Sequence, residues 1–150
     1  MIEISRVAEQ DLAELLPLMR GYCDFYEVTP SDEELLALSR ALIADPERDG
    51  VQLLARDGAE ALGFATIYWS WATTIASRIG VMNDLYVAPA ARGTGAAELL
   101  IHVCVEECRR HGAAELTWQT APDNERAQRV YDRVGAKRSQ WVDYSLSVRP

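Results

Sequence analysis

The sequence predicts one mixed α/β domain in which a central sheet is covered by helices on both faces. Segments with β-type patterning alternate along the chain with segments of helical periodicity, in the order β-α-α-β-β-β-α-β-α-β. No Gly/Ser/Pro-rich linker and no internal repeat divides the 150 residues. Hydrophobic residues make up 49% and charged residues 25%, which is the balance of a soluble domain with one sizeable core.

The first elements have local signals. A strand is expected over Ile2–Arg6, followed from Ala8 by an amphipathic helix with apolar residues at helical spacing. Pro17 lies inside this pattern and predicts a kink or an early end, because proline lacks a backbone N–H. Ser31 and Glu34 form the capping-box pattern that opens a second helix, which Asp45-Pro46 closes.

The later elements follow from turn residues and periodicity. An Asp57-Gly58 turn predicts a hairpin, and Gly112 predicts the left-handed stop of a long helix that contains Cys104 and Cys108. Helices are expected over residues 97–111 and 125–134, and strands over 51–55, 62–71, 79–87, 116–120 and 141–148.

The charge balance disfavours nucleic acids and anionic membranes as partners. With 15 basic and 23 acidic residues the net charge is −8 and the pI about 4.7. Such a chain repels phosphate backbones and anionic membranes, so neither is an expected partner. Acidity suits cationic or zwitterionic partners, but ordinary solubility explains it better. The N-terminal residues lack signal-peptide features and no stretch approaches the ~20 apolar residues of a membrane span, so a cytoplasmic protein is expected.

The remaining chemically reactive side chains indicate no metal or disulfide chemistry. Three cysteines cannot form a fully paired framework, and Cys104 and Cys108, one helical turn apart, are expected to pack in the core. His102 and His111 are expected at the surface. No metal-ligand spacing is present, so no metal is expected.

The most informative stretch is a strand, a turn at Pro89 and a glycine-rich loop that leads directly into a helix. Glycines let the backbone approach a ligand, and the helix start offers unpaired N–H groups and a positive dipole end. This arrangement predicts an anion site, most plausibly for phosphate. The P-loop pattern GxxxxGK[ST] is absent, and a dinucleotide GxGxxG pattern fails because Glu98 stands at its last position.

The loop instead has the pattern Arg-x-x-Gly-x-Ala at Arg92, Gly95 and Ala97, which resembles the acetyl-CoA pyrophosphate loop of GNAT-type N-acetyltransferases. The stretch from Asp123 to Ala136 resembles the second signature of that family, Asn-x-x-Ala-x-x-x-Tyr-x-x-x-Gly. Every marked position is filled, by Asn124, Ala127, Tyr131 and Gly135. The resemblance covers nearly the whole chain, and residues 62–87 and 141–146 look most like the diamine and polyamine acetyltransferase branch.

The resemblance implies a mostly antiparallel sheet with a splayed parallel strand pair, a homodimer, and acetyl-CoA as co-substrate. The pantetheine arm would pair with the backbone of Leu85 and Val87, and the thioester oxygen would meet a backbone N–H near Leu85. Asn124 would reach the pantetheine. The residues implied in cofactor binding are Leu85, Tyr86, Val87, Arg92, Gly93, Thr94, Gly95, Ala96, Ala97, Asn124 and Ala127.

An amine acceptor needs a base. With a pKa of about 10.4, only one alkyl amine in about 2,500 is neutral at pH 7. The polyamine branch has a Glu beside an Asp on this strand, whereas this chain has Asn83 beside Asp84. Asp84 is therefore the leading candidate base, with a water chain or a purely structural carboxylate as alternatives.

Tyr131 is the candidate general acid, because a neutral phenol can protonate a departing thiolate. Its alternative role is aromatic packing of the last helix.

Acceptor recognition is expected from residues 22–27, which include Tyr22, Asp24, Tyr26 and Glu27, from Asn83, and from residues 69–74. Acidic and aromatic side chains together suit an ammonium ion, although the same cluster also fits a plain helix end. The predicted activity is transfer of acetyl to a small cationic amine such as a diamine, polyamine or amino acid. Two alternatives stay open, which are a protein or peptide N-terminal acetyltransferase and a catalytically silent acyl-CoA-binding regulator.

Overall fold

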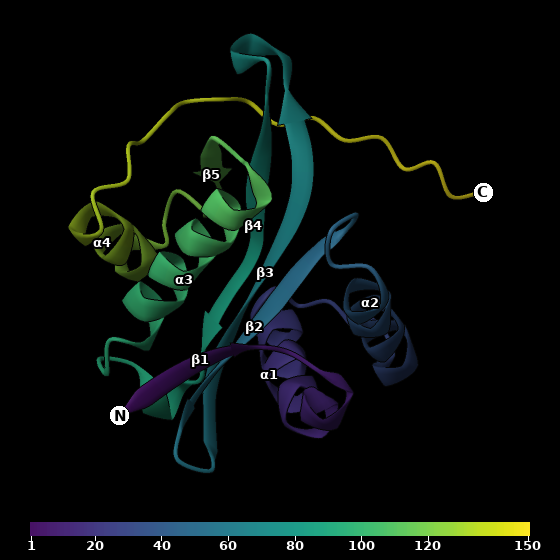
Figure 1. The fold of residues 1–150 in the computed structure, drawn as a ribbon, viewed down its shortest axis with the longest axis vertical. Coiled ribbons are helices and arrows are strands. Elements are labelled where there is room, and N and C mark those ends of the chain that lie inside the picture. The colour runs from purple at the N-terminus through teal and green to yellow at the C-terminus, as the bar shows by residue number, and fades with distance from the viewer. The chain divides into compact units, whose positions relative to one another are not determined.

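A computed structural model describes all 150 residues as two compact units, Met1–Gln119 and Thr120–Pro150. The first unit contains a five-stranded sheet whose strands lie side by side in chain order (Figure 1). Neighbouring strands are antiparallel except β4 and β5, which are parallel. This confirms the predicted mostly antiparallel sheet with one parallel pair. The strands are β1 (Ile2–Arg6), β2 (Gly50–Asp57), β3 (Glu60–Ala72), β4 (Ser77–Val87) and β5 (Glu115–Thr117).

Helices cover both faces of this sheet, as predicted. Figure 1 shows α1 (Leu12–Phe25) and α2 (Asp32–Ala44) on one side and α3 (Ala96–His111) on the other. Successive strand residues point to opposite faces, so Phe64 joins the core cluster under α1 while Gly80 faces α3. A Cβ at Gly80 would lie 2.5 Å from the Cys108 sulfur, which explains why this position is glycine.

The local signals for caps and turns are confirmed. The Ser31 hydroxyl accepts from the Glu34 backbone N–H at 3.1 Å, and the Glu34 carboxylate accepts from the Ser31 N–H at 2.7 Å. β2 and β3 form the predicted hairpin, and Gly112 ends α3 in the left-handed conformation, with φ of 80°.

Of the two outcomes predicted for Pro17, a kink or an early end of the helix, the early end is wrong. α1 runs through Pro17 for 14 residues. The missing N–H costs about one helical hydrogen bond. Burial of five side chains against the sheet outweighs that cost, and these are Leu12, Leu15, Leu18, Met19 and Cys23.

The predicted strand over residues 141–148 is absent. The second unit contains one helix, α4 (Glu125–Arg133), and an extended segment without strand hydrogen bonds. Tyr144, Leu146 and Val148 are each more than 90% exposed. Their alternation with polar residues favours a strand locally, but a strand is stable only when another strand bonds to it, and this unit contains none.

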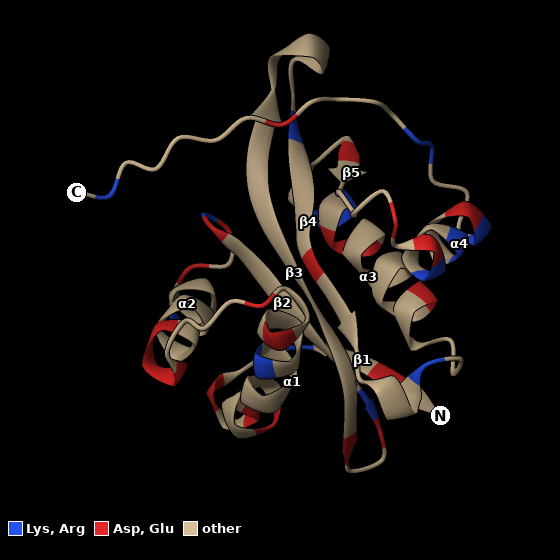
Figure 2. Cartoon of the chain, turned by 180° about the vertical axis from the view of Figure 1, so that it is seen from behind, with Lys and Arg blue, Asp and Glu red and all other residues tan.

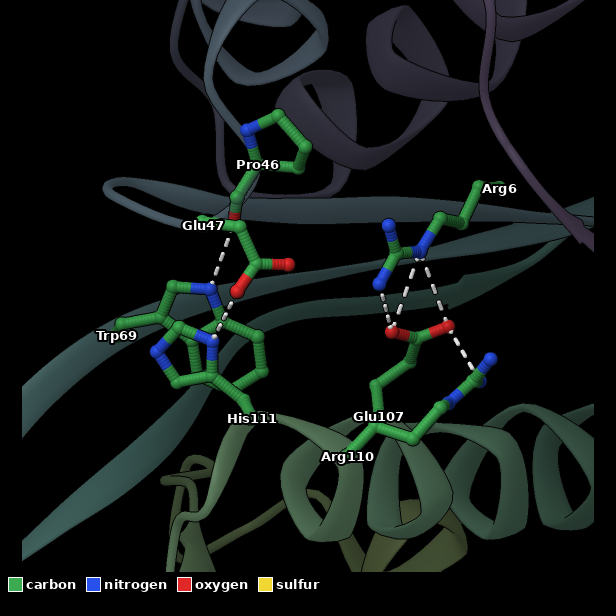
Figure 3. Close-up of polar contacts among 7 residues, drawn as sticks. All are labelled: Arg6, Pro46, Glu47, Trp69, Glu107, Arg110 and His111. Atoms are coloured by element: carbon green, nitrogen blue, oxygen red, sulfur yellow. Dashed lines mark hydrogen bonds and ion pairs between the residues drawn. The ribbon is translucent and has the colours of Figure 1, made fainter.

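The end of α3 is more buried than its polar sequence suggests. The Glu107 side chain is 2% exposed and binds Arg6 of β1, with the shortest contact at 2.5 Å, and Arg110 at 2.7 Å (Figure 3). His111 is not a surface residue, which corrects the expectation. Its ring stacks on Trp69 at 3.9 Å, and its two nitrogens lie 3.4 Å from Glu47 and 2.9 Å from Arg78.

Cys104 and Cys108 are buried and unpaired, as expected, and so is Cys23. None of the helices combines the length and the apolar composition that a membrane crossing requires. His102 is exposed.

Candidate active site

The candidate site is built around a β-bulge in β4. Thr66 of β3 pairs with Asp84, but the next residue, Ile67, pairs with Met82. Asn83 is therefore an extra residue on β4. Because a bulge breaks the alternation of faces, Met82 and Asp84 point to opposite sides of the sheet although they are two positions apart. Asp84 consequently lies on the face that α1 covers.

The Asp84 carboxylate is surrounded by hydrogen-bond donors. The Asn83 side-chain amide donates to it at 2.9 Å, and the hydroxyls of Thr66 and Tyr22 are further partners. The Tyr22 hydroxyl also lies 3.2 Å from the Asn83 carbonyl oxygen. Burial raises the pKa of Asp84, and the hydrogen bonds from Thr66, Tyr22 and Asn83 act in the opposite direction. The net result is a pKa above the ordinary value, which suits a base better than a fully solvated carboxylate would.

Aromatic rings line the approach to this carboxylate. The Tyr22 ring lies 5.0 Å from Tyr26 and 6.3 Å from Tyr86. Burial and the neighbouring Asp84 charge raise the pKa of Tyr68 to about 12. The pKa of Tyr22 is also raised, chiefly by burial. Both phenols are thus neutral over the physiological range.

The predicted acceptor-binding residues fall into two groups. Asp24 and Glu27 are exposed at the carboxyl end of α1, where the 46% exposed Tyr26 lies against Tyr22 with the two rings tilted by 58°. Trp69, in contrast, stacks on His111 and donates its indole N–H to the Pro46 carbonyl at 2.8 Å. It lies on the α3 face of the sheet, away from the Asp84 cluster.

The splayed strand pair is confirmed. β4 and β5 pair only from Ile79 with Glu115 to Val81 with Thr117. Beyond that point β4 has β3 on one side and no strand on the other, so the edge at Leu85 and Val87 is open for pairing.

The glycine-rich loop has the geometry of an anion-binding turn. Gly93 and Gly95 have φ of 81° and 88°, and a Cβ at either would meet no atom within 4 Å. The Thr94 hydroxyl donates to the Ala91 carbonyl at 2.6 Å and holds the turn closed. α3 begins at Ala96, so its first N–H groups follow the loop directly, with the exposed Arg92 beside it.

The second signature lies on α4 of the second unit. Asn124 caps this helix, because its side-chain oxygen accepts from the Ala127 N–H at 3.3 Å. Tyr131 lies on the last part of the helix, and Gly135, with φ of 83°, follows its end. The structure therefore brings Asn83, Asp84 and Tyr22 together in the first unit, whereas Asn124, Ala127 and Tyr131 share α4.

Three residues near Asp84 escaped the sequence analysis, namely Gln52, Thr66 and Tyr68. The available signal was a polar side chain inside an otherwise apolar stretch, since Gln52 and Thr66 each stand between apolar residues of their strands. Across the chain, no cluster of three His, Cys, Asp or Glu side chains is placed to hold a metal ion.

Comparison with known proteins agrees with this geometry. The model of the acetyltransferase (GNAT) family matches residues 15–136. The uncharacterized N-acetyltransferase YhfO of Bacillus subtilis is 30% identical over 148 residues, covering 98% of both chains. A thialysine N-epsilon-acetyltransferase of Caenorhabditis elegans is 26% identical, covering 88% of this chain and 81% of the relative.

Solved structures share the fold. The crystal structure of a probable acetyltransferase is 28% identical with a TM-score of 0.84, covering 99% of both chains. An aminoglycoside N-acetyltransferase in complex with CoA has a TM-score of 0.85 at 19% identity, covering 99% of this chain and 96% of that one. Together with the loop and signature residues, these matches show that the chain belongs to the acetyltransferase (GNAT) family and is an acetyl-CoA-dependent N-acetyltransferase.

Proposed function

We propose that the protein transfers the acetyl group of acetyl-CoA directly to a primary amine of a small cationic acceptor, such as a diamine, a polyamine or an amino acid with a side-chain amine. The observation that carries this proposal is the Asp84 carboxylate, with a raised pKa, at the base of an aromatic cluster that leads to the exposed acids of α1. An ammonium group is attracted both by carboxylates and by the faces of aromatic rings.

Asp84 has the role of general base. The acceptor arrives as an ammonium ion, and its nitrogen is nucleophilic only after it loses a proton. Asp84 accepts that proton, directly or through one water, while the rings of Tyr22 and Tyr26 hold the cation. Asp24 and Glu27 bind a second positive charge of the acceptor, and Asn83 orients the Asp84 carboxylate by its 2.9 Å hydrogen bond.

The residues present fit acetyl-CoA. At the open edge of β4, Leu85 and Val87 offer backbone groups to an amide-containing chain, and Tyr86 lies between them. The loop and helix start from Arg92 to Ala97 offer a side-chain cation and backbone N–H groups to a pyrophosphate. Asn124 and Ala127 are proposed to contact the same co-substrate, and Tyr131 to donate a proton to the leaving sulfur. Residues 1–150 are thereby proposed to act as one domain, in the cytoplasm and as a homodimer.

The likeness to a thialysine N-epsilon-acetyltransferase supports a small acceptor, because thialysine is an amino acid with a primary amine at the end of its side chain. The acidic residues visible on α1 and α2 in Figure 2 agree with a cationic rather than an anionic acceptor.

The test is a thiol-release assay with acetyl-CoA and a panel of about fifty amines. Diamines, polyamines and amino acids with a side-chain amine should give the highest kcat/KM, and anionic amines and neutral alcohols the lowest. Loss of one charge-assisted contact should cost about 1.5–3 kcal/mol, or roughly 10- to 150-fold. Best activity on free peptide N-termini would support the N-terminal acetyltransferase alternative. Binding of acetyl-CoA without turnover of any amine would support the silent regulator.

A further inference from the structure

Three polar side chains cross the sheet in one row and end at the candidate base. Gln52 of β2 pairs in register with Thr66 of β3, and Thr66 pairs in register with Asp84 of β4. Register partners share a face, so all three side chains lie on the side that α1 covers. Gln52 is 4% exposed and Thr66 is fully buried. Two buried polar side chains in the middle of an apolar core need an explanation beyond packing.

The hydrogen bonds in this row have a fixed direction. The Gln52 side-chain amide donates to the Thr66 hydroxyl oxygen at 3.1 Å. An ionised carboxylate only accepts, so the single hydroxyl proton of Thr66 is directed to Asp84. If the Gln52 amide were reversed, its oxygen would compete for that proton and draw it away from Asp84. The orientation of the Gln52 amide therefore decides whether the Thr66 hydroxyl donates its proton to the Asp84 carboxylate.

Gln52 is held in this orientation by its surroundings. Its amide nitrogen also lies 3.7 Å from the Met19 sulfur. Its carbonyl oxygen is buried and has no hydrogen-bond partner. Gln52 is one of the residues that line a cavity of about 170 Å³, together with Ser39 and Leu42. A buried acceptor without a partner is unfavourable for folding. Its retention indicates that the donor end of the amide is what this position requires.

We propose that Gln52 and Thr66 are positioning residues that orient the Asp84 carboxylate and stabilise its ionised form. This inference rests on the proposed role of Asp84 as the base. Burial favours the protonated carboxyl, which does not accept a proton from the acceptor, and the hydrogen bond from Thr66 opposes this effect. The row does not conduct protons, because a side-chain amide does not release its proton near neutral pH.

The other titratable groups facing Asp84 do not obscure its titration. These are Tyr22 and Cys23 from α1 and Tyr68 from β3. The pKa of each is raised, so all three are neutral between pH 5 and about 8. No basic side chain is among the interactions that shift the pKa of Asp84. These three groups therefore do not ionise where a carboxyl group titrates.

The experiment compares Thr66→Val with Thr66→Ser. Valine keeps the branched shape and removes the hydroxyl, whereas serine keeps the hydroxyl. The acidic limb of the kcat/KM profile should move to higher pH by about one unit in Thr66→Val, which is a tenfold loss on that limb with little change on the plateau. Thr66→Ser should stay close to the parent.

Gln52 is tested by a second matched pair. In Gln52→Glu the new carboxyl, when ionised, accepts the Thr66 proton, so the acidic limb should again move to higher pH. In Gln52→Met the amide is replaced by an apolar side chain of similar size that does not compete for the Thr66 proton, so the shift should be smaller. Thermal melting of all four variants controls for loss of fold.

A direct readout separates this inference from the proposed function. The Asp84 carboxyl carbon, titrated by carbon-13 NMR in the absence of any substrate, should show the same order of pKa values, with Thr66→Val and Gln52→Glu above the parent. Equal pKa values in folded variants would overturn the positioning role, even if their turnover fell. If the parent acetylates no amine, the proposed function fails. The titration of Asp84 still shows whether Gln52 and Thr66 stabilise its ionised form. Should Thr66→Val not fold, Gln52→Met, which adds no charge, decides the role of Gln52, and an Asp84 pKa equal to that of the parent would overturn it.

Discussion

At the Asp84 side chain, burial and hydrogen bonding act in opposite directions on one carboxyl group. The bulge at Asn83 turns Asp84 towards α1, where desolvation raises its pKa. Since the raised pKa belongs to the folded state only, folding favours the protonated form. The protonated carboxyl therefore adds to the free energy of unfolding. This contribution is complete below the ordinary carboxyl pKa of about 4, and it is lost as the pH rises through the raised pKa of the folded state.

Asp84→Asn tests both consequences. The base is lost, so kcat/KM on the best amine should fall by at least about 100-fold at pH 7, with the largest deficit towards lower pH where free amine is scarcest. The uncharged amide removes the cost of a buried charge, so the melting temperature at pH 8 should equal or exceed that of the parent. Steady-state kinetics and differential scanning fluorimetry measure these two effects. A variant that turns over like the parent would leave a water chain as the proton acceptor.

Tyr131→Phe tests the proposed general acid. Thiolates leave without much help, because the parent thiol has a pKa of about 8.5. The loss in kcat should therefore lie near the lower end of general acid catalysis, at roughly 100-fold. Melting temperature and acetyl-CoA affinity by calorimetry should match the parent, since the ring is retained. Unchanged turnover would make Tyr131 a packing residue and water the proton donor.

At the scale of elements, the loop before α3 depends on glycine for two reasons. Gly95 has φ of 88°, which strains any residue with a Cβ, and its open surroundings leave room for a ligand to approach. Gly112 at the other end of α3 has φ of 80° and equally open surroundings, so it carries the same strain without adjoining the loop.

Because Gly95 and Gly112 share the left-handed conformation, Gly112 serves as the control for a substitution at Gly95. Gly95→Val and Gly112→Val should each lower stability by about 1–2 kcal/mol, because both force a branched residue into the left-handed region. Only Gly95→Val should weaken acetyl-CoA binding, by well over tenfold. Calorimetry with acetyl-CoA and thermal melts distinguish the two. Equal affinities of the two variants would remove the pyrophosphate-loop assignment.

Two adjacent glutamates of α3, Glu106 and Glu107, differ in their burial and in the ion pairs that they form. Glu107 is 2% exposed and joins Arg6 of β1 to Arg110, whereas Glu106 is 58% exposed and pairs with Arg109 of its own helix. Glu107→Ala removes the shared acceptor of two cations, although both arginine side chains are partly exposed and can turn to water. It should destabilise the protein by about 2 kcal/mol, and Glu106→Ala by less than about 0.5 kcal/mol. Urea unfolding measures both, and equal losses would contradict the bridging role of Glu107.

At the scale of the whole molecule, the net charge of −8 attracts cationic acceptors. Raising the ionic strength from 0.01 to 0.15 M shortens the screening length from about 30 Å to about 8 Å. The KM of a diamine should therefore rise several-fold with salt, and that of a monoamine less.

The double variant Asp24→Asn/Glu27→Gln should reduce this difference. Glu60→Gln, an exposed acid at the β2–β3 turn, changes the net charge without touching the α1 end and serves as control. Initial rates over a salt series give the KM values. An equal salt dependence of diamine and monoamine would contradict acceptor binding by the acids of α1.

The sequence by itself determined the features that depend on residues close together along the chain. The Ser31–Glu34 cap, the hairpin turn, the left-handed stop at Gly112 and the glycine loop before α3 all appear where they were predicted. Each depends on backbone geometry within a few residues, so composition and spacing suffice. The two family signatures are local in the same sense and led to the family through a resemblance.

The tertiary structure decided the features that depend on how strands pair. The bulge that points Asp84 towards α1, and the row from Gln52 through Thr66, arise from register between residues that are 14 or more positions apart along the chain. The same dependence explains the failed strand over residues 141–148, whose alternation found no partner, and the burial of His111 against Trp69. A pattern along one strand states which residues alternate, but only the neighbouring strands decide which face is buried and which polar groups meet there.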